Sequence, residues 1–408
     1  MSKLYKAIIL LLLIITLGTF YDVITTVNRE KDIAWDFFAY YEVTDNIVQG
    51  NNPYNTDNFT VPGLIWKAPP IVNPGYTLFF LPYTLLKPHT AKLVFLLINI
   101  FLGVGIILLV FARMRLLKPK DLFNPDKNTL LAVVSIFIFL NSTPFIYTLI
   151  TGQSLLLILA CLILVLFSGD LWMRIAAFSI SAVFKYSLLP LLGIWLLIKK
   201  RFALCVGGFL LFILWGLVPL FFGYDLGALY GNYLANLIAN MSAEGLNTFR
   251  ISGFDMLQFD FLNCSFTNAA VKLILIGIAF WAMLGERKKT GISINLLFLL
   301  GCVTMIISYH RLYDLIIILP ILLILWNNSF RKGQWLQFSI TGLFLLFFLI
   351  ERTYIIVFAN WLGGLIGPNP VLVLNTHKQF STIFPVYPIV MFLMAAYSVY
   401  LFLKEDAI

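Results

Sequence analysis

The feature that most constrains this chain is a succession of long apolar runs separated by short polar links. The first run covers residues 7–27 and a later one covers residues 91–111. An α-helix needs about 20 predominantly apolar residues to cross a bilayer, and it satisfies its backbone polar groups internally. Hydrophobic residues form 61% of the 408 residues and the mean hydropathy is +0.93, more than a water-soluble domain can bury. The sequence therefore predicts an all-α, polytopic membrane protein.

The runs predict roughly 12 crossings or half-crossings, counted at the length that a bilayer requires. They leave no room for a soluble domain, so a single transmembrane domain is expected over residues 1–408. The first run is too long for a cleaved signal peptide and is expected to be retained as a helix. Three larger polar segments are expected as outer-face loops, the first catalytic and the others covering the substrate: residues 28–90, 223–266 and 351–382.

Basic residues set the orientation, because cytoplasmic loops of membrane proteins carry an excess of Lys and Arg. Lys3 and Lys6 place the amino terminus in the cytoplasm, so residues 28–90 emerge on the outer face. Residues 173–198 admit two interpretations: a single span with Lys185 in mid-membrane, or a helical hairpin with its apex near Lys185. The hairpin places more of the 28 Lys and Arg on the cytoplasmic side, so it is the favoured interpretation.

The longest polar run, residues 35–82, follows the first predicted span and contains the strongest catalytic candidate. Asp36 comes directly after that span and is flanked by aromatic residues that can desolvate a carboxylate. Asp45 lies further along and is compatible with an ordinary solvated carboxylate. We therefore predict that Asp36 is the catalytic carboxylate.

Other polar side chains gather on the same predicted face, where a charge in or near the membrane is costly and often functional. Lys185 suits a phosphate at the headgroup level, although a lysine that simply extends to the interface fits as well. His310 and Arg311 are either interface anchors or cations for the same phosphate, with Asp314 orienting Arg311. Gln153 either caps a helix or contacts a sugar hydroxyl. The remaining substrate-binding candidates are Asn52, Tyr54, Asn247, Arg250 and Tyr309.

Missing motifs argue against several kinds of chemistry. The predicted outer face has no Asp-x-Asp pair, no His-x-x-x-His occurs, and no glycine-rich nucleotide loop follows a strand. The four cysteines show no metal-ligand spacing. We therefore expect no metal, no cofactor, and a donor anchored in lipid rather than a nucleotide sugar. The net charge of +9 reflects membrane topology, so no nucleic-acid partner is expected, and no obligate protein partner is evident.

In these motifs the sequence resembles glycosyltransferase family 87, the polyprenyl-phosphate-mannose-dependent α-mannosyltransferases of the GT-C fold. The resemblance covers most of the chain and implies that Asp36 is the general base, with basic residues binding the lipid phosphate. Where such proteins often have Tyr-Pro-Pro, this chain has residues 66–70 as Trp-Lys-Ala-Pro-Pro, which leaves the sugar open. The matching motifs are residues 36–41 and 50–54, Pro69-Pro70 before Pro74, Gly152-Gln153, Lys185 with Pro190 and the basic stop at 199–201, and Tyr309-His310-Arg311.

The residues and the resemblance together predict an inverting transfer of a sugar, expected to be mannose, from a polyprenyl-phosphate donor. The acceptor would be a hydroxyl of a lipid-linked or glycan molecule, and Lys185, Arg311 and His310 would bind the donor phosphate. The expected location is the inner or plasma membrane, among its lipids, with the active site on the extracytoplasmic face.

Two other classes stay open. A lipid-linked sugar flippase or transporter requires polar residues on both sides of the midplane. An undecaprenyl-diphosphate glycan ligase or polymerase is expected to carry more arginines on the outer face. The polar residues here gather outside and outer arginines are few, which favours the transferase.

Overall fold

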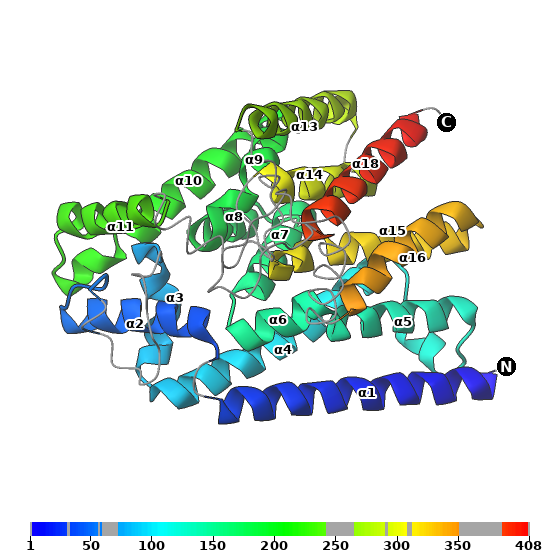
Figure 1. The fold of residues 1–408 in the computed structure, drawn as a ribbon, viewed down its shortest axis with the longest axis horizontal. Coiled ribbons are helices and arrows are strands. Elements are labelled where there is room, and N and C mark those ends of the chain that lie inside the picture. The colour runs from blue at the N-terminus through cyan, green and yellow to red at the C-terminus, as the bar shows by residue number, and fades with distance from the viewer. Residues whose placement is uncertain are drawn as a thin grey trace, which may run out of the picture. The chain divides into compact units, whose positions relative to one another are not determined.

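The structure is a computed structural model in which all described regular structure is helical (Figure 1). It describes residues 2–30, 33–55, 58, 72–241, 265–289, 293–307, 312–350 and 386–406. The expected all-α class is confirmed for this part of the chain.

Several described helices are long and apolar enough to cross a bilayer. These five are Lys3–Arg29, Pro88–Arg113, Lys127–Thr151, Phe202–Phe222 and Ala269–Lys288. Shorter apolar helices follow at Leu155–Phe167, Ile294–Ile307, Trp335–Leu349 and Ile389–Lys404. The described part of the chain therefore contains five candidate membrane spans, whereas the total of 12 crossings stays a prediction.

The chain divides into two compact units, each described here by itself. The first unit comprises Met1–Phe20, Gly103–Tyr147 and Arg250–Ile408, and the second comprises Tyr21–Leu102 and Thr148–Phe249. Three helices contribute residues to both units: α1 (Ser2–Arg29), α4 (Pro88–Arg113) and α6 (Thr143–Thr151).

The first unit is held by apolar helices with a few polar side chains buried between them. Within it α14 packs against α13 and α18, and α15 packs against α5 and α16. The buried Asn327 side chain donates a hydrogen bond from its amide nitrogen to Ser135 Oγ at 2.7 Å, which joins α15 to α5. The described elements are η3 (Pro119–Leu122), α5 (Lys127–Asn141), α13 (Ser265–Gly285), η7 (Glu286–Lys288), α14 (Ile294–Ile307), η8 (Leu312–Ile317), α15 (Leu319–Arg331), α16 (Trp335–Leu349) and α18 (Val386–Asp406).

The second unit contains the elements around Asp36 and Lys185. Its helix α8 packs against α7 and α10, and α2 packs against α3. Besides its shares of α1, α4 and α6, the described elements are α2 (Trp35–Gln49), η2 (Pro74–Tyr76), α3 (Thr77–Thr84), α7 (Leu155–Phe167), α8 (Leu171–Lys185), η4 (Tyr186–Leu188), α9 (Pro190–Ile198), α10 (Phe202–Gly216), η5 (Val218–Phe222) and α11 (Leu226–Met241).

Two of the expected loops contain helices instead. Residues 28–90 include α2 and α3, so Asp36 lies in a helix rather than in an extended loop, and residues 223–266 include α11. Helix α2 forms because most of its side chains, including four of its five aromatic residues, are buried, and burial stabilises a segment whose β-branched and aromatic residues have weak helix propensity. Residues 351–382 lie outside the described part of the chain.

Residues 173–198, for which the sequence allowed a single span or a hairpin, do not form one continuous helix. Helix α8 ends at Lys185, and α9 begins at Pro190, a residue that cannot continue a preceding helix. A Cβ atom placed on Gly193 of α9 would lie 4.0 Å from Phe178 Cζ of α8. Such proximity requires the chain to bend between the two helices, whereas the membrane hairpin with its apex at Lys185 stays a prediction.

Candidate active site

Asp36 lies in the first turn of α2, where a carboxylate interacts favourably with the helix dipole. The side chain is partly buried, and its Oδ2 atom is shielded from solvent. The residue that precedes the helix, Ala34, has a left-handed backbone with φ 65° and ψ 35°, and its N–H donates to the Ile150 carbonyl at 2.9 Å. A non-glycine residue in this conformation is strained, so the surrounding structure fixes the turn that carries Asp36.

The Gly152-Gln153 turn lies against the start of α2. Gly152 has φ 74°, and a Cβ atom at this position would lie 2.6 Å from Phe37 Cβ. Gln153 is 7% exposed, and its Oε1 atom accepts a hydrogen bond from the Tyr40 hydroxyl at 3.2 Å. Gln153, from a distant part of the chain, therefore contacts the same helix, α2, that carries Asp36.

Tyr40 and Tyr76 connect this helix to the end of α8. Their rings stack with centroids 4.8 Å apart, and the Tyr76 hydroxyl donates to the Phe184 carbonyl at 2.5 Å. Burial raises the pKa of Tyr76 well above its usual range, and the neighbouring Tyr233 and Asp36 raise it further. Tyr76 is therefore a neutral hydrogen-bond donor near Asp36, and it binds the carbonyl that directly precedes Lys185.

Lys185 is the last residue of α8 and is partly buried. Its backbone (φ −157°, ψ 76°) leaves the helical region, and the short helix η4 follows. The next residue, Tyr186, is 57% exposed and also contributes to the raised pKa of Tyr76. The end of α8 that carries Lys185 is therefore connected, through Tyr76 and Tyr40, to the helix that carries Asp36.

Asn52 and Tyr54 have structural contacts in the turn after α2. The Asn52 side chain accepts a hydrogen bond from the Tyr54 N–H at 3.0 Å, and the Tyr54 hydroxyl donates to the Val72 carbonyl at 2.8 Å. Tyr54 is buried in a cluster with Leu229 and Tyr233 of α11, whereas Asn52 is exposed. Their expected contact with substrate stays a prediction, and the exposed Asn52 amide is better placed for it than the engaged Tyr54 hydroxyl.

The remaining candidates are distributed differently. Asp314 is fully buried in η8 of the first unit, whereas Asp36, Gln153 and Lys185 belong to the second unit. Five candidates lie outside the described residues: Asn247, Arg250, Tyr309, His310 and Arg311. The expected pairing of Arg311 with Asp314 therefore also lies outside them.

Two buried charged side chains near Asp36 were not among the sequence candidates. Glu42 of α2 is fully buried. Lys92 of α4 is 2% exposed, and its Nζ atom donates to the Glu30 carbonyl at 3.1 Å and lies 5.7 Å from the centre of the Phe38 ring. A charged residue inside an otherwise apolar run was the signal for Lys92. No such signal distinguished Glu42 from neighbouring polar residues.

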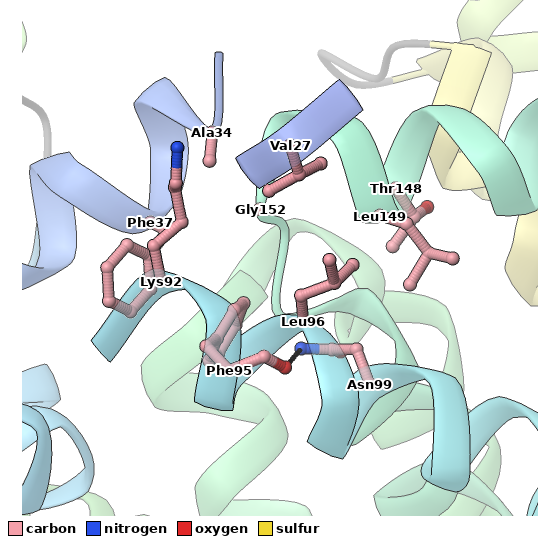
Figure 2. Close-up of a pocket in the computed structure, with 10 residues that line it drawn as sticks. All are labelled: Val27, Ala34, Phe37, Lys92, Phe95, Leu96, Asn99, Thr148, Leu149 and Gly152. Atoms are coloured by element: carbon pink, nitrogen blue, oxygen red, sulfur yellow. Dashed lines mark hydrogen bonds between the residues drawn. The ribbon is translucent and has the colours of Figure 1, made fainter. Parts of the chain in front are cut away.

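Lys92 lines a narrow pocket shown in Figure 2. The pocket lies between α4, the start of α2 and the end of α6, and Lys92 extends from α4 toward the segment that carries Ala34 and Phe37. Gly152 and Thr148 form part of the opposite wall. Both residues that fix the first turn of α2, Ala34 and Gly152, therefore share a pocket with a buried cation.

Metal ligands do not cluster in the part of the chain that the structure describes. No group of three or more His, Cys, Asp or Glu side chains in that part could hold a metal ion. The described part of the site offers a carboxylate, a lysine, an amide and tyrosine hydroxyls, which suit proton transfer and the binding of hydroxyl groups and phosphate.

Comparison with known proteins gives one match. The model of glycosyltransferase family 87 matches residues 73–308, more than half of the 408 residues. No curated protein and no solved structure matches. The matched region contains Gln153 and Lys185, whereas Asp36 precedes it and Asp314 follows it.

Proposed function

The chain belongs to glycosyltransferase family 87, and from this premise we propose that it transfers a sugar from a polyprenyl-phosphate donor to an acceptor hydroxyl. Membership makes the protein a membrane glycosyltransferase. The finer proposal is that the sugar is mannose and that the acceptor is a lipid-linked or glycan molecule on the extracytoplasmic face. The observation that carries the proposed transfer reaction is the partly buried Asp36 in a fixed helix turn, near Gln153 and Tyr76 and in the same unit as Lys185. Mannose as the sugar rests on the sequence resemblance alone.

In the proposed reaction the acceptor oxygen forms a bond to the anomeric carbon while the bond from that carbon to the phosphate oxygen breaks. The acceptor proton passes to the Asp36 carboxylate, and the bonding electrons leave with the lipid phosphate. Attack opposite to the leaving group inverts the anomeric configuration. Lys185 would stabilise the charge on the departing phosphate, which allows the reaction to proceed without a metal.

The predicted membrane topology supports an extracytoplasmic location for both Asp36 and Lys185. Lys3 and Lys6 lie at the start of α1, and Asp36 follows shortly after its end. The distribution of Lys and Arg over the whole chain, interpreted by the positive-inside rule, assigns the start of α1 to the cytoplasm, so the far end of the helix is assigned to the extracytoplasmic side. The interruption at Lys185 allows that residue to reach the same side.

A direct test is a mass-spectrometric assay of the purified protein with a panel of polyprenyl-phosphate sugars. We expect transfer from the mannose donor and expect it to persist in excess EDTA, because the lipid monophosphate does not need a metal to leave. Nucleotide sugars in the same assay are the control. Transfer from a nucleotide sugar, or activity lost with EDTA and restored by magnesium or manganese, would contradict the proposal.

The role of Lys185 predicts a change mainly in donor binding. Lys185→Ala removes a cation that faces the phosphate both in the ground state and in the transition state, so the donor KM is expected to rise about tenfold or more. Lys199→Ala is a matched control from the next basic cluster, assigned to the cytoplasmic side. Steady-state kinetics with varied donor concentration give the comparison. An unchanged donor KM in Lys185→Ala would remove this residue from the phosphate site.

A further inference from the structure

Lys92 is a buried cation for which the proposed reaction has no use. It lies in the first part of α4, within a candidate membrane span, and is 2% exposed. An ammonium group removed from water is costly unless it is compensated by hydrogen bonds or by other favourable contacts. The compensation that the structure gives it is specific: the Glu30 carbonyl and the face of the Phe38 ring.

Both partners of Lys92 flank Asp36 in the chain. Glu30 follows the last residue of α1, and Phe38 lies in α2 just after Asp36. The ammonium group of Lys92, which extends from α4, therefore has two contacts. It binds the Glu30 carbonyl just after α1, and it contacts the Phe38 ring at the start of α2. The pocket in Figure 2 shows the same arrangement, because Lys92 shares it with Ala34, which precedes α2, and with Phe37 in the first turn of that helix.

We propose that Lys92 is a positioning residue, which fixes the α1–α2 connection through the Glu30 carbonyl and so places the Asp36 carboxylate. This inference rests on the proposed function, since it assumes that Asp36 is the base. Ala34 has a strained backbone conformation, so the connection needs external contacts to hold it. The Ile150 carbonyl and Gly152 supply such contacts from one side, and Lys92 supplies them from the other.

The test is a double-mutant cycle between Lys92 and Asp36, measured as kcat and donor KM. Lys92→Met keeps the length and apolar stem of the side chain and removes the ammonium. We expect kcat to fall about tenfold with an unchanged donor KM, and Lys92→Arg to restore most of the loss because it retains a cationic donor. Lys87→Met, an exposed lysine just before α4, is the matched control and is expected to leave kcat unchanged.

The cycle separates positioning from a general structural role. If Lys92 acts through the carboxylate of Asp36, Lys92→Met should have little further effect in the Asp36→Asn protein, whereas independent effects would multiply. A multiplicative loss, or a raised donor KM in Lys92→Met, would overturn the inference. Should Lys92→Met fail to fold, the cycle is run with Lys92→Gln. The proposed function is tested separately by the donor panel: no transfer from any polyprenyl-phosphate sugar would contradict it. Normal turnover in Asp36→Asn would instead remove Asp36 as the base, and with it the positioning role of Lys92.

Discussion

Asp36→Asn is expected to lower kcat by about a hundredfold or more while donor KM stays nearly unchanged. Asparagine keeps the size of the side chain and its capacity to form hydrogen bonds, but it cannot take the acceptor proton. The first turn of α2 is held by the Ala34 N–H and by the close approach of Gly152 to Phe37, contacts that the substitution leaves in place. Initial rates of sugar transfer by purified protein, with donor and acceptor varied in turn, provide the measurement.

Asp45→Asn is the matched control, because Asp45 is a second carboxylate on the same helix. Its Oδ2 atom accepts a hydrogen bond from the Gln49 side chain at 2.6 Å. Burial raises the pKa of Asp45, and the Gln49 bond opposes this rise. We expect its turnover to stay close to that of the unmodified protein. Normal turnover in Asp36→Asn together with a large loss in Asp45→Asn would transfer the role of base to Asp45.

Gly152→Ala is expected to impair both stability and catalysis. The left-handed conformation at φ 74° costs an L-residue about 1–2 kcal/mol, and the added methyl group would lie 2.6 Å from Phe37 Cβ. Overpacking of this kind costs about 1–3 kcal/mol, and it pushes on the residue next to Asp36. A displacement of about 1 Å can lower a rate by about a hundredfold, so kcat should fall by up to that factor. Thermal unfolding in detergent and the transfer assay measure the two effects.

Gly50→Ala separates the two causes. Gly50 ends α2 with nearly the same backbone, φ 77°, but a Cβ atom there would meet nothing within 4 Å. This substitution should show only the conformational cost, about 1–2 kcal/mol, with little change in kcat. Equal losses of activity in the two variants would show that contact between Gly152 and Phe37 does not position Asp36.

The sequence predicted the helical class, and it placed Asp36 and Gln153 on one predicted face; in the structure Asp36 belongs to α2 and Gln153 is hydrogen-bonded to Tyr40 of the same helix. Membrane topology made both possible, because apolar runs of fixed length bring polar residues to their ends, and those ends can meet on one face. The break at Lys185 could be predicted from Pro190 together with the charge distribution. Each of these inferences depends on local sequence patterns, namely the length of apolar runs and the positions of charges, which the bilayer constrains more strictly than water does.

Contacts between distant segments could not be predicted in the same way. Asp36 was expected in a loop because the composition of α2 resembles a polar linker, and only the burial of its aromatic face by other segments makes it a helix. Tyr76 was missed because its partner is the backbone carbonyl of Phe184, which carries no sequence signal. Lys92 had a signal, a charge inside an apolar run, but its contact with the Glu30 carbonyl could not be predicted from the sequence. The family-model match begins at residue 73, so it does not test the role of general base that the sequence resemblance implies for Asp36.

Several tyrosines around the site share one type of partner. Tyr41, Tyr54, Tyr76 and Tyr224 all donate their hydroxyl hydrogens to main-chain carbonyls. Every residue type supplies a carbonyl, so these bonds do not by themselves restrict the side chains at the positions that receive them. Among relatives of this chain, the donor should therefore persist at Tyr54 even where Val72 has been replaced, whereas Phe184 is also restricted by the packing of its ring on Tyr76.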